Sequence, residues 1–240
     1  MKLEDFISKR LQIGRRSARA LILDGKVTHR GAPTEDHRCE VTRFDEVTVG
    51  GKILQSSLPR LYLMLHKPVG ILSATSDREH RTVLDLIDHP DKATLHLAGR
   101  LDRGSTGLVL LSNDGQWTGS LTSPGRKVEK SYLVETDRPI PAEAMARFAE
   151  GFPFPTEGIT TLPALLEILE PQRARVTLQE GRYHQIKRMF HRLDGIRLRS
   201  LHRDRIGPLS LPEGLKPGQW RPLTGAELDA FAEPPSSGID

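Results

Sequence analysis

The 240-residue sequence predicts an α+β fold made of a small N-terminal domain and a larger second domain. Three observations support this prediction. Many strand-like segments are separated by short turns, two short helices with helical apolar spacing open the chain, and a polar segment ending in proline divides it. The predicted domains span residues 1–58 and 59–231, and residues 232–240 have a composition typical of disorder.

Cysteine, histidine and charge content exclude several classes of protein. The single cysteine, Cys39, excludes an internal disulfide and a multi-cysteine zinc site, which favours a reducing, cytoplasmic location. His80, His89 and His96 lack metal-ligand spacing, so no metal site is predicted. No apolar run approaches the roughly eighteen residues that cross a bilayer, so no membrane partner is expected. The net charge is only +4, but its uneven placement indicates a polyanionic partner.

Basic residues concentrate in the first predicted helices. Helical spacing predicts helices over 3–11 and 18–24, and alternation predicts strands near 26–29 and 45–54. Residues 1–30 hold eight basic side chains against three acidic ones. Around the start of the second helix, free backbone N–H groups and the helix dipole favour phosphate. We therefore expect RNA contacts from a cluster of three arginines: Arg15, Arg16 and Arg19. The pattern alone fits a solvated charged face equally well.

The second domain is organised around residues 96–115, HLAGRLDRGSTGLVLLSNDG. A strand near 60–66 precedes this stretch, which itself predicts a strand, a polar loop with one acid, and a second strand over 107–112. The acid is Asp102. An acid in a loop between two buried strands is positioned rigidly and stays reachable. On spacing alone, a structural turn is the more frequent explanation of such a loop.

Asp102 has no acidic partner in this stretch. The nearest other acid is Asp114, and the intervening strand spans roughly 20 Å. The spacing therefore favours a lone nucleophile over the two-carboxylate site of glycoside hydrolysis.

The rest of the domain continues the same alternation of elements. We expect a helix over 115–122 capped by Asn113 or Asp114, a strand over 126–135, and a helix over 141–151 with Met145, Phe148 and Ala149 inward. Strands over 164–168 and 173–179 follow, then a strand-to-helix segment over 180–190. A final helix is expected to be capped at Thr224. Residues 173–205 hold ten basic and three acidic side chains, the most basic part of the chain.

Four segments of the second domain together resemble the RsuA group of RNA pseudouridine synthases. GRLDRGSTGLVLLSNDG is similar to the signature of that group, which implies that Asp102 is the catalytic carboxylate. The H-K-P-x-G run contains Lys67 and resembles the opening element. K-x-Y matches at residues 130–132, which implies that Tyr132 stacks on an extruded uracil. EGRYHQIKRM resembles the third motif, which implies that Lys187 pairs with Asp102.

The resemblance also implies which side chains bind substrate or RNA phosphates. Those residues are Lys67, Arg100, Lys130, Arg182, His184, Gln185 and Arg188, and Arg192, Arg199 and Arg203 are also assigned to phosphates. Local pattern alone would make Lys67 a solvent-exposed turn residue, Tyr132 a core tyrosine and each arginine a surface ion pair.

Upstream of these motifs, the first domain resembles the S4-type RNA-binding module. Leu3, Phe6, Arg16, Gly25 and Val27 are among the residues that fall on its pattern. For the second domain, the many strands separated by short turns and the synthase resemblance together indicate a mostly antiparallel mixed sheet with a central cleft. The synthase resemblance also implies isomerisation of one uridine in small-subunit (16S) ribosomal RNA, within a subunit assembly intermediate. We expect a monomer without a cofactor, because this isomerisation changes neither composition nor oxidation state. Two alternatives stay open: a sister synthase for large-subunit (23S) RNA, and a non-catalytic RNA-binding assembly factor.

Overall fold

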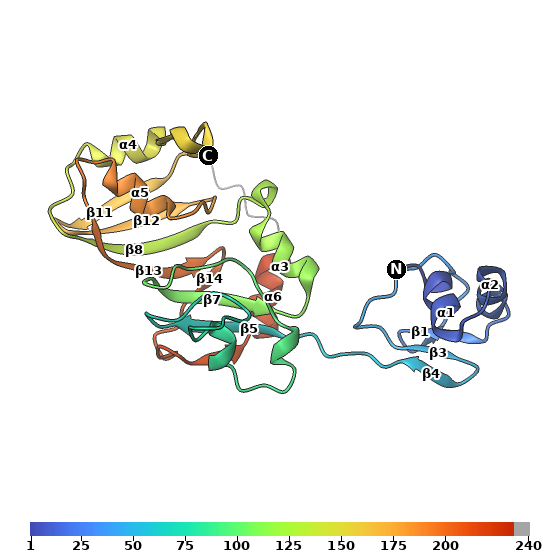
Figure 1. Cartoon of the computed structure of the whole chain (residues 1–240). Coiled ribbons are helices and arrows are strands. Elements are labelled where there is room, and N and C mark those ends of the chain that lie inside the picture. Colours follow the sequence, from blue (N-terminus) through green and yellow to red (C-terminus); the bar gives the residue numbers. More distant parts are fainter. Residues whose placement is uncertain (233–240) are drawn as a thin grey trace. The chain divides into compact units, whose positions relative to one another are not determined.

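The computed structural model describes residues 1–232, which form two compact units (Figure 1). The first unit is Met1–Arg60 and the second begins at Leu61, close to the predicted boundary after residue 58. The predicted disordered tail lies outside the described residues, except for Ala232, which ends the last helix. Within residues 1–232, no helix has the length and apolarity to span a membrane, and no cluster of His, Cys, Asp and Glu is arranged to hold a metal ion.

The first unit packs two helices against a small antiparallel sheet with strand order β2-β1-β3-β4. Its elements are α1 (Leu3–Leu11), α2 (Arg15–Leu23), β1 (Val27–His29), β2 (Ala32–Pro33), β3 (Val47–Val49) and β4 (Lys52–Gln55). The apolar residues at helical spacing in α1 and α2 meet the strands in one core, in which Ile7, Ile22 and Val47 have no exposed surface. The helix α2 begins three residues before the predicted position, so all three clustered arginines belong to it.

A nine-stranded mixed sheet forms the second unit, with order β11-β12-β8-β13-β7-β5-β15 and with β14 beside β13 and β6 beside β7. Every pairing is antiparallel except that of β13 with β7, which confirms the predicted sheet class. The strands are β5 (Tyr62–Lys67), β6 (His96–Leu97), β7 (Thr106–Ser112), β8 (Lys130–Thr136), β11 (Leu165–Glu170), β12 (Arg173–Leu178), β13 (Leu198–Ile206), β14 (Leu209–Ser210) and β15 (Trp220–Pro222). A separate hairpin pairs β9 (Pro153–Phe154) with β10 (Ile159–Thr160).

Both faces of the central strands are covered. Side chains of β7 alternate between two apolar clusters, with Val109 in one and Leu108 in the other, and β5 does the same with Leu65 and Met64. All four residues are fully buried. Strand β5 is therefore buried on both faces, because helices lie on both sides of the sheet.

Four helices provide this cover (Figure 1). They are α3 (Gly115–Thr122), α4 (Ala144–Glu150), α5 (Gln185–His191) and α6 (Gly225–Ala232), with short 3₁₀ turns at Val83–Leu86, Lys92–Thr94, Pro124–Arg126 and Pro155–Glu157. Phe148 of α4 packs on Phe190 of α5, with ring centroids 5.1 Å apart, and Trp117 of α3 packs on Phe231 of α6. The buried positions of α4 are Ala144 and Phe148; Met145 and Ala149 were predicted inward but are exposed.

The parallel junction between β13 and β7 requires a glycine. Gly107 pairs with Arg203, has a φ of +113°, and a Cβ placed on it would lie 2.2 Å from the Arg203 carbonyl oxygen. Gly107→Ala is expected to lower the free energy of unfolding by more than about 3 kcal/mol, because the backbones must separate. Chemical denaturation measures this loss. Gly104→Ala is the matched control, since open space surrounds Gly104, and equal stability of the two variants would contradict the argument.

Candidate active site

Asp102 lies on the loop between β6 and β7, at the centre of the sheet. Its carbonyl accepts a hydrogen bond from the Ser105 N–H at 3.0 Å, which closes a tight turn around it. The Leu101 N–H donates to Ser73 Oγ at 3.0 Å and fixes the residue before the acid. The side chain of Asp102 is 27% exposed. The carboxylate is therefore held by the scaffold and remains accessible to a ligand.

Two side chains from the start of α5 contact this carboxylate. Lys187 Nζ donates to Asp102 Oδ2 at 2.6 Å, and His184 Nε2 lies 3.4 Å from Oδ1. The close contact with Lys187 is the one that the sequence resemblance implied across 85 residues. His184 precedes the helix with a φ of +50°, a conformation that histidine adopts more readily than most side chains. Each oxygen of the carboxylate thus faces a side-chain nitrogen, that of Lys187 at Oδ2 and that of His184 at Oδ1.

Lys67 holds the backbone of the same loop. Its amine donates to three backbone carbonyls, those of Pro68, Arg103 and Ser105, at 3.0, 3.3 and 2.7 Å. Lys67 has no exposed surface, so the sequence-based assignment of Lys67 to RNA contact was wrong. The amine is saturated by carbonyls of the Asp102 loop, and its role is to fix the backbone of that loop.

Burial of Lys67 predicts a pH-dependent stability difference. Burial lowers the pKa of the Lys67 amine from 10.5 to about 8, although the charge of Asp102 opposes this shift. Between these pH values the unfolded chain keeps a proton that the folded chain has lost, so the stability of the wild type should rise with pH. Relative to Lys67→Met, we expect a gain of about 2 kcal/mol, measured by urea denaturation from pH 7.5 to 10. Parallel pH profiles for the two proteins would contradict this expectation.

Arg203 is a second buried cation near the loop. Only 1% of it is exposed, and its guanidinium donates to the carbonyls of Leu108 at 2.8 Å and Arg100 at 3.3 Å. Its assignment to a phosphate was therefore wrong. Arg203 Nη2 is buried without a hydrogen-bond partner among the described residues. The side chain connects β13 to β7 and to the residue two positions before Asp102.

The K-x-Y element lies on β8, which neighbours β13 in the sheet. Tyr132 is 7% exposed and belongs to the same apolar cluster as Leu101 and Ile186, the neighbours of Asp102 and Lys187 in the chain. The guanidinium carbon of Arg203 lies 6.0 Å from the centre of its ring. Lys130 donates to the Val128 carbonyl, and burial lowers the pKa of its amine to about 8.

The remaining predicted contacts differ in their accessibility. Arg100 is exposed, and Arg182 is held by Glu180 at 3.0 Å with its side chain 40% exposed. Gln185 is only 4% exposed; it donates to Glu180 and accepts from the Arg182 N–H, so it shapes the turn and is not positioned to touch RNA. Arg188 forms a two-pronged ion pair with Glu157 and covers the Phe154 ring.

Comparison with known proteins identifies the family. Residues 61–192, which contain Asp102, Tyr132 and Lys187, match the sequence profile described as RNA pseudouridylate synthase. This chain is a member of the RNA pseudouridylate synthase family. A ribosomal small subunit pseudouridine synthase A of Pseudomonas aeruginosa is 46% identical over 95% of this chain and 99% of its own length. The protein of the same name from Escherichia coli is 40% identical over 95% and 98% of the two chains.

A solved structure agrees with the family assignment. The crystal structure of a pseudouridylate synthase superposes with a TM-score of 0.70 and 37% sequence identity, covering 96% of this chain and 99% of that one. This RNA pseudouridylate synthase therefore shares its fold with that enzyme across both units. The family profile also covers this site, since residues 61–192 include the Asp102 loop that precedes β7.

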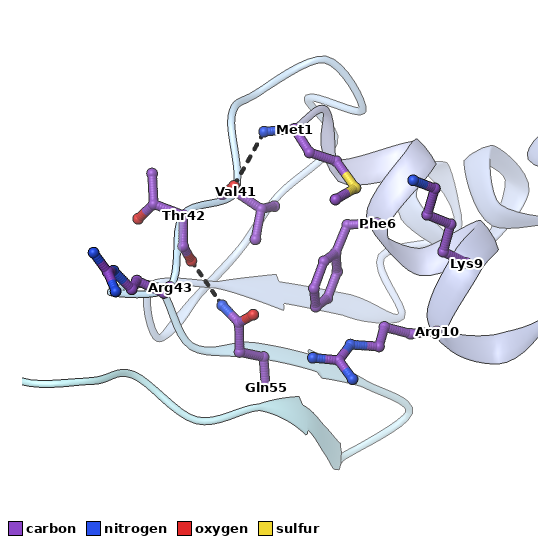
Figure 2. A pocket seen from close by; sticks show the side chains of 8 residues that line it. All are labelled: Met1, Phe6, Lys9, Arg10, Val41, Thr42, Arg43 and Gln55. Atoms are coloured by element: carbon purple, nitrogen blue, oxygen red, sulfur yellow. Dashed lines mark hydrogen bonds between the residues drawn. The ribbon is translucent and has the colours of Figure 1, made fainter. Parts of the chain in front are cut away.

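The first unit of this RNA pseudouridylate synthase holds the predicted arginine cluster. Arg15 pairs with Asp5 at 2.6 Å and Arg19 with Glu4 at 2.8 Å, whereas Arg16 has no polar partner among residues 1–232. Figure 2 shows a pocket elsewhere on the same unit, where Lys9 and Arg10 border Phe6. The sequence does not reveal this pocket, because its lining residues come from two distant segments, residues 1–10 and 41–55.

Sequence reasoning also missed Tyr183 in this RNA pseudouridylate synthase. The residue is 77% exposed and its ring stacks on that of His184. The available signal was its position between Arg182 and His184, which were both predicted to bind substrate or RNA. An isolated aromatic residue in a basic segment is common, however, so the signal is weak.

Proposed function

We propose that this protein isomerises a uridine of small-subunit (16S) ribosomal RNA to pseudouridine, with Asp102 as the catalytic carboxylate. The observation that carries the proposal is the partly exposed carboxylate of Asp102, with Lys187 Nζ 2.6 Å from Oδ2, inside the segment that matches the family. The choice of RNA is supported by relatives up to 46% identical over 95% of the chain that are named as small-subunit enzymes.

The reaction fits the groups at this site. The bond from uracil N1 to ribose C1′ breaks, the base turns, and C5 bonds to C1′; C5 loses its proton and N1 gains one. Composition and oxidation state do not change, so no cofactor is required. The carboxylate of Asp102 acts at C1′, as a nucleophile or as the stabiliser of a developing cation. Lys187 orients this carboxylate through its charge-assisted hydrogen bond to Oδ2.

Substrate binding must expose the target base. The uridine leaves its stack and enters the central cleft that we propose in the catalytic domain, residues 59–231. Tyr132 forms the apolar surface on which the uracil lies, and Lys130, two residues earlier on β8, contributes a cation to the binding of the RNA. The exposed side chains of Arg100 and Arg182 contact the flanking phosphates.

The N-terminal domain, residues 1–58, serves in this proposal as an S4-type module that binds RNA through α2. Arg16 projects without a partner among residues 1–232, and Arg15 and Arg19 are 72% and 48% exposed in their side chains despite their ion pairs. Contacts to phosphate release counterions, so their number sets the salt dependence of binding.

Replacing Arg15, Arg16 and Arg19 together by glutamine is expected to weaken RNA binding and to flatten its salt dependence. The slope of log affinity against log salt should fall by about 1 to 2. Filter binding of 16S RNA fragments at several salt concentrations measures it. Lys26, Arg38 and Lys52 replaced by glutamine form the charge-matched control, because these residues are exposed on the same unit. Equal slopes for both triple variants would remove α2 from the RNA interface.

The proposed setting is the cytoplasm, where a monomer acts on a small-subunit assembly intermediate. Pseudouridine mapping of ribosomal RNA from cells lacking and regaining the protein tests the function. Loss and return of one site in 16S RNA is the expected result. A change in 23S RNA would identify a large-subunit enzyme, and no change in either RNA would make the protein a non-catalytic binder.

A further inference from the structure

Tyr183 is an exposed aromatic residue beside the Asp102 site. Its relative exposure is 77%, and among the described residues it is the only aromatic member of the exposed large apolar side chains. A ring in this position adds nothing to the core of the free protein. Its apolar faces are better accommodated against a partner than against water.

One face of the Tyr183 ring is already occupied. The ring lies nearly parallel to that of His184, with centroids 3.9 Å apart and an interplanar angle of 18°. His184 Nε2 in turn lies 3.4 Å from Asp102 Oδ1. The two rings therefore form a stack that begins at the carboxylate and ends in solvent.

The backbone holds this stack in place. His184 has a left-handed φ of +50°, a conformation that costs energy and that the surrounding contacts maintain. The Tyr183 carbonyl accepts a hydrogen bond from Arg188 Nη1 at 3.3 Å, and Arg188 is anchored by its ion pair with Glu157. The free face of the tyrosine is thus presented at a fixed place.

We propose that Tyr183 and His184 form a stacking platform for a nucleobase that neighbours the target uridine. This inference rests on the proposed function. When the uridine swings out of its stack toward Asp102, the adjacent base loses a stacking partner, and the free face of Tyr183 replaces it. The charge around the platform favours an RNA strand as the occupant. Arg182 directly precedes Tyr183 in the chain, Arg100 lies two residues before Asp102, and both arginines are exposed.

Stacking on an aromatic face does not require a particular base. The platform therefore contributes affinity and positioning of the strand, while recognition of uracil belongs to the groups at Asp102. A role in strand binding predicts an effect on KM with little effect on kcat. A merely structural role would instead change thermal stability.

The test uses the full chain with Tyr183→Ala, Tyr183→Leu and Tyr183→Phe. The probe for binding is a single-stranded RNA oligomer with 2-aminopurine next to a uridine, because stacking on an aromatic ring quenches its fluorescence. We expect Tyr183→Ala and Tyr183→Leu to bind about 5- to 150-fold more weakly and to lose the quenching, whereas Tyr183→Phe keeps both. Leu169→Ala, at another exposed apolar side chain, is the control and should behave as wild type.

A second measurement separates this inference from the proposed function. Isomerisation is followed on ribosomal RNA from cells lacking the protein, and Tyr183→Ala should raise KM by a similar factor with kcat changed less than about threefold. Unchanged binding, quenching and KM in Tyr183→Ala, with an active wild type, would overturn the platform alone. A wild type that quenches the probe but isomerises no RNA would overturn the proposed function and leave the platform supported.

Discussion

Asp102→Asn is expected to abolish pseudouridine formation, with a rate loss of at least roughly 1,000-fold, while RNA affinity changes less than about threefold. The amide has the size and shape of the carboxylate but carries no charge, so it cannot attack C1′ or stabilise a cation there. The measurement is the single-turnover rate of tritium release from RNA labelled at uracil C5, together with filter binding of the same RNA.

Asp88→Asn is a suitable control, because Asp88 is an exposed carboxylate of the same domain. That variant should retain wild-type rates. Turnover within tenfold of the wild type in Asp102→Asn would remove this residue from the chemistry. A loss of affinity equal to the loss of rate would instead assign Asp102 to binding.

The sheet and the helices were largely predictable because local sequence determines them. The alternation of apolar residues and the turn at Gly115 placed β7 and α3 to within one residue of their observed bounds. The cap at Asp114, which accepts from the N–H groups of Gln116 and Trp117, was also visible in the sequence. In α4 the buried pair is Ala144 and Phe148, four residues apart, so the core-facing stripe is centred one position earlier than the predicted one, which put Met145 inward.

The supports of the site were not predictable in the same way. Lys67, Arg203 and Gln185 are polar residues in basic or turn-rich segments, and local pattern places such residues on the surface. Their burial depends on distant backbone, since the carbonyls that receive Lys67 and Arg203 come from the Asp102 loop and from β7. Only the fold brings these groups together, so the sequence could indicate candidate reacting residues but not the residues that hold them.

The ion pair of Lys187 with Asp102 should also be needed for the reaction. Lys187→Met is expected to lower kcat by about 100-fold or more with a smaller change in KM, because the carboxylate loses the cation 2.6 Å from Oδ2 that orients it and supports its charge. Rates under saturating RNA, compared with those of Lys187→Arg, measure this effect.

The arginine variant distinguishes charge from shape at this position. Lys187→Arg keeps the cation but replaces a compact amine by a planar fork, so part of the rate should return. Lys216→Met, at an exposed lysine of the same domain, should leave the rate unchanged. In the double variant with Asp102→Asn, the loss at Lys187 should disappear, since an amide has no charge to orient. Additive losses would show that Lys187 acts on the RNA directly and not through Asp102.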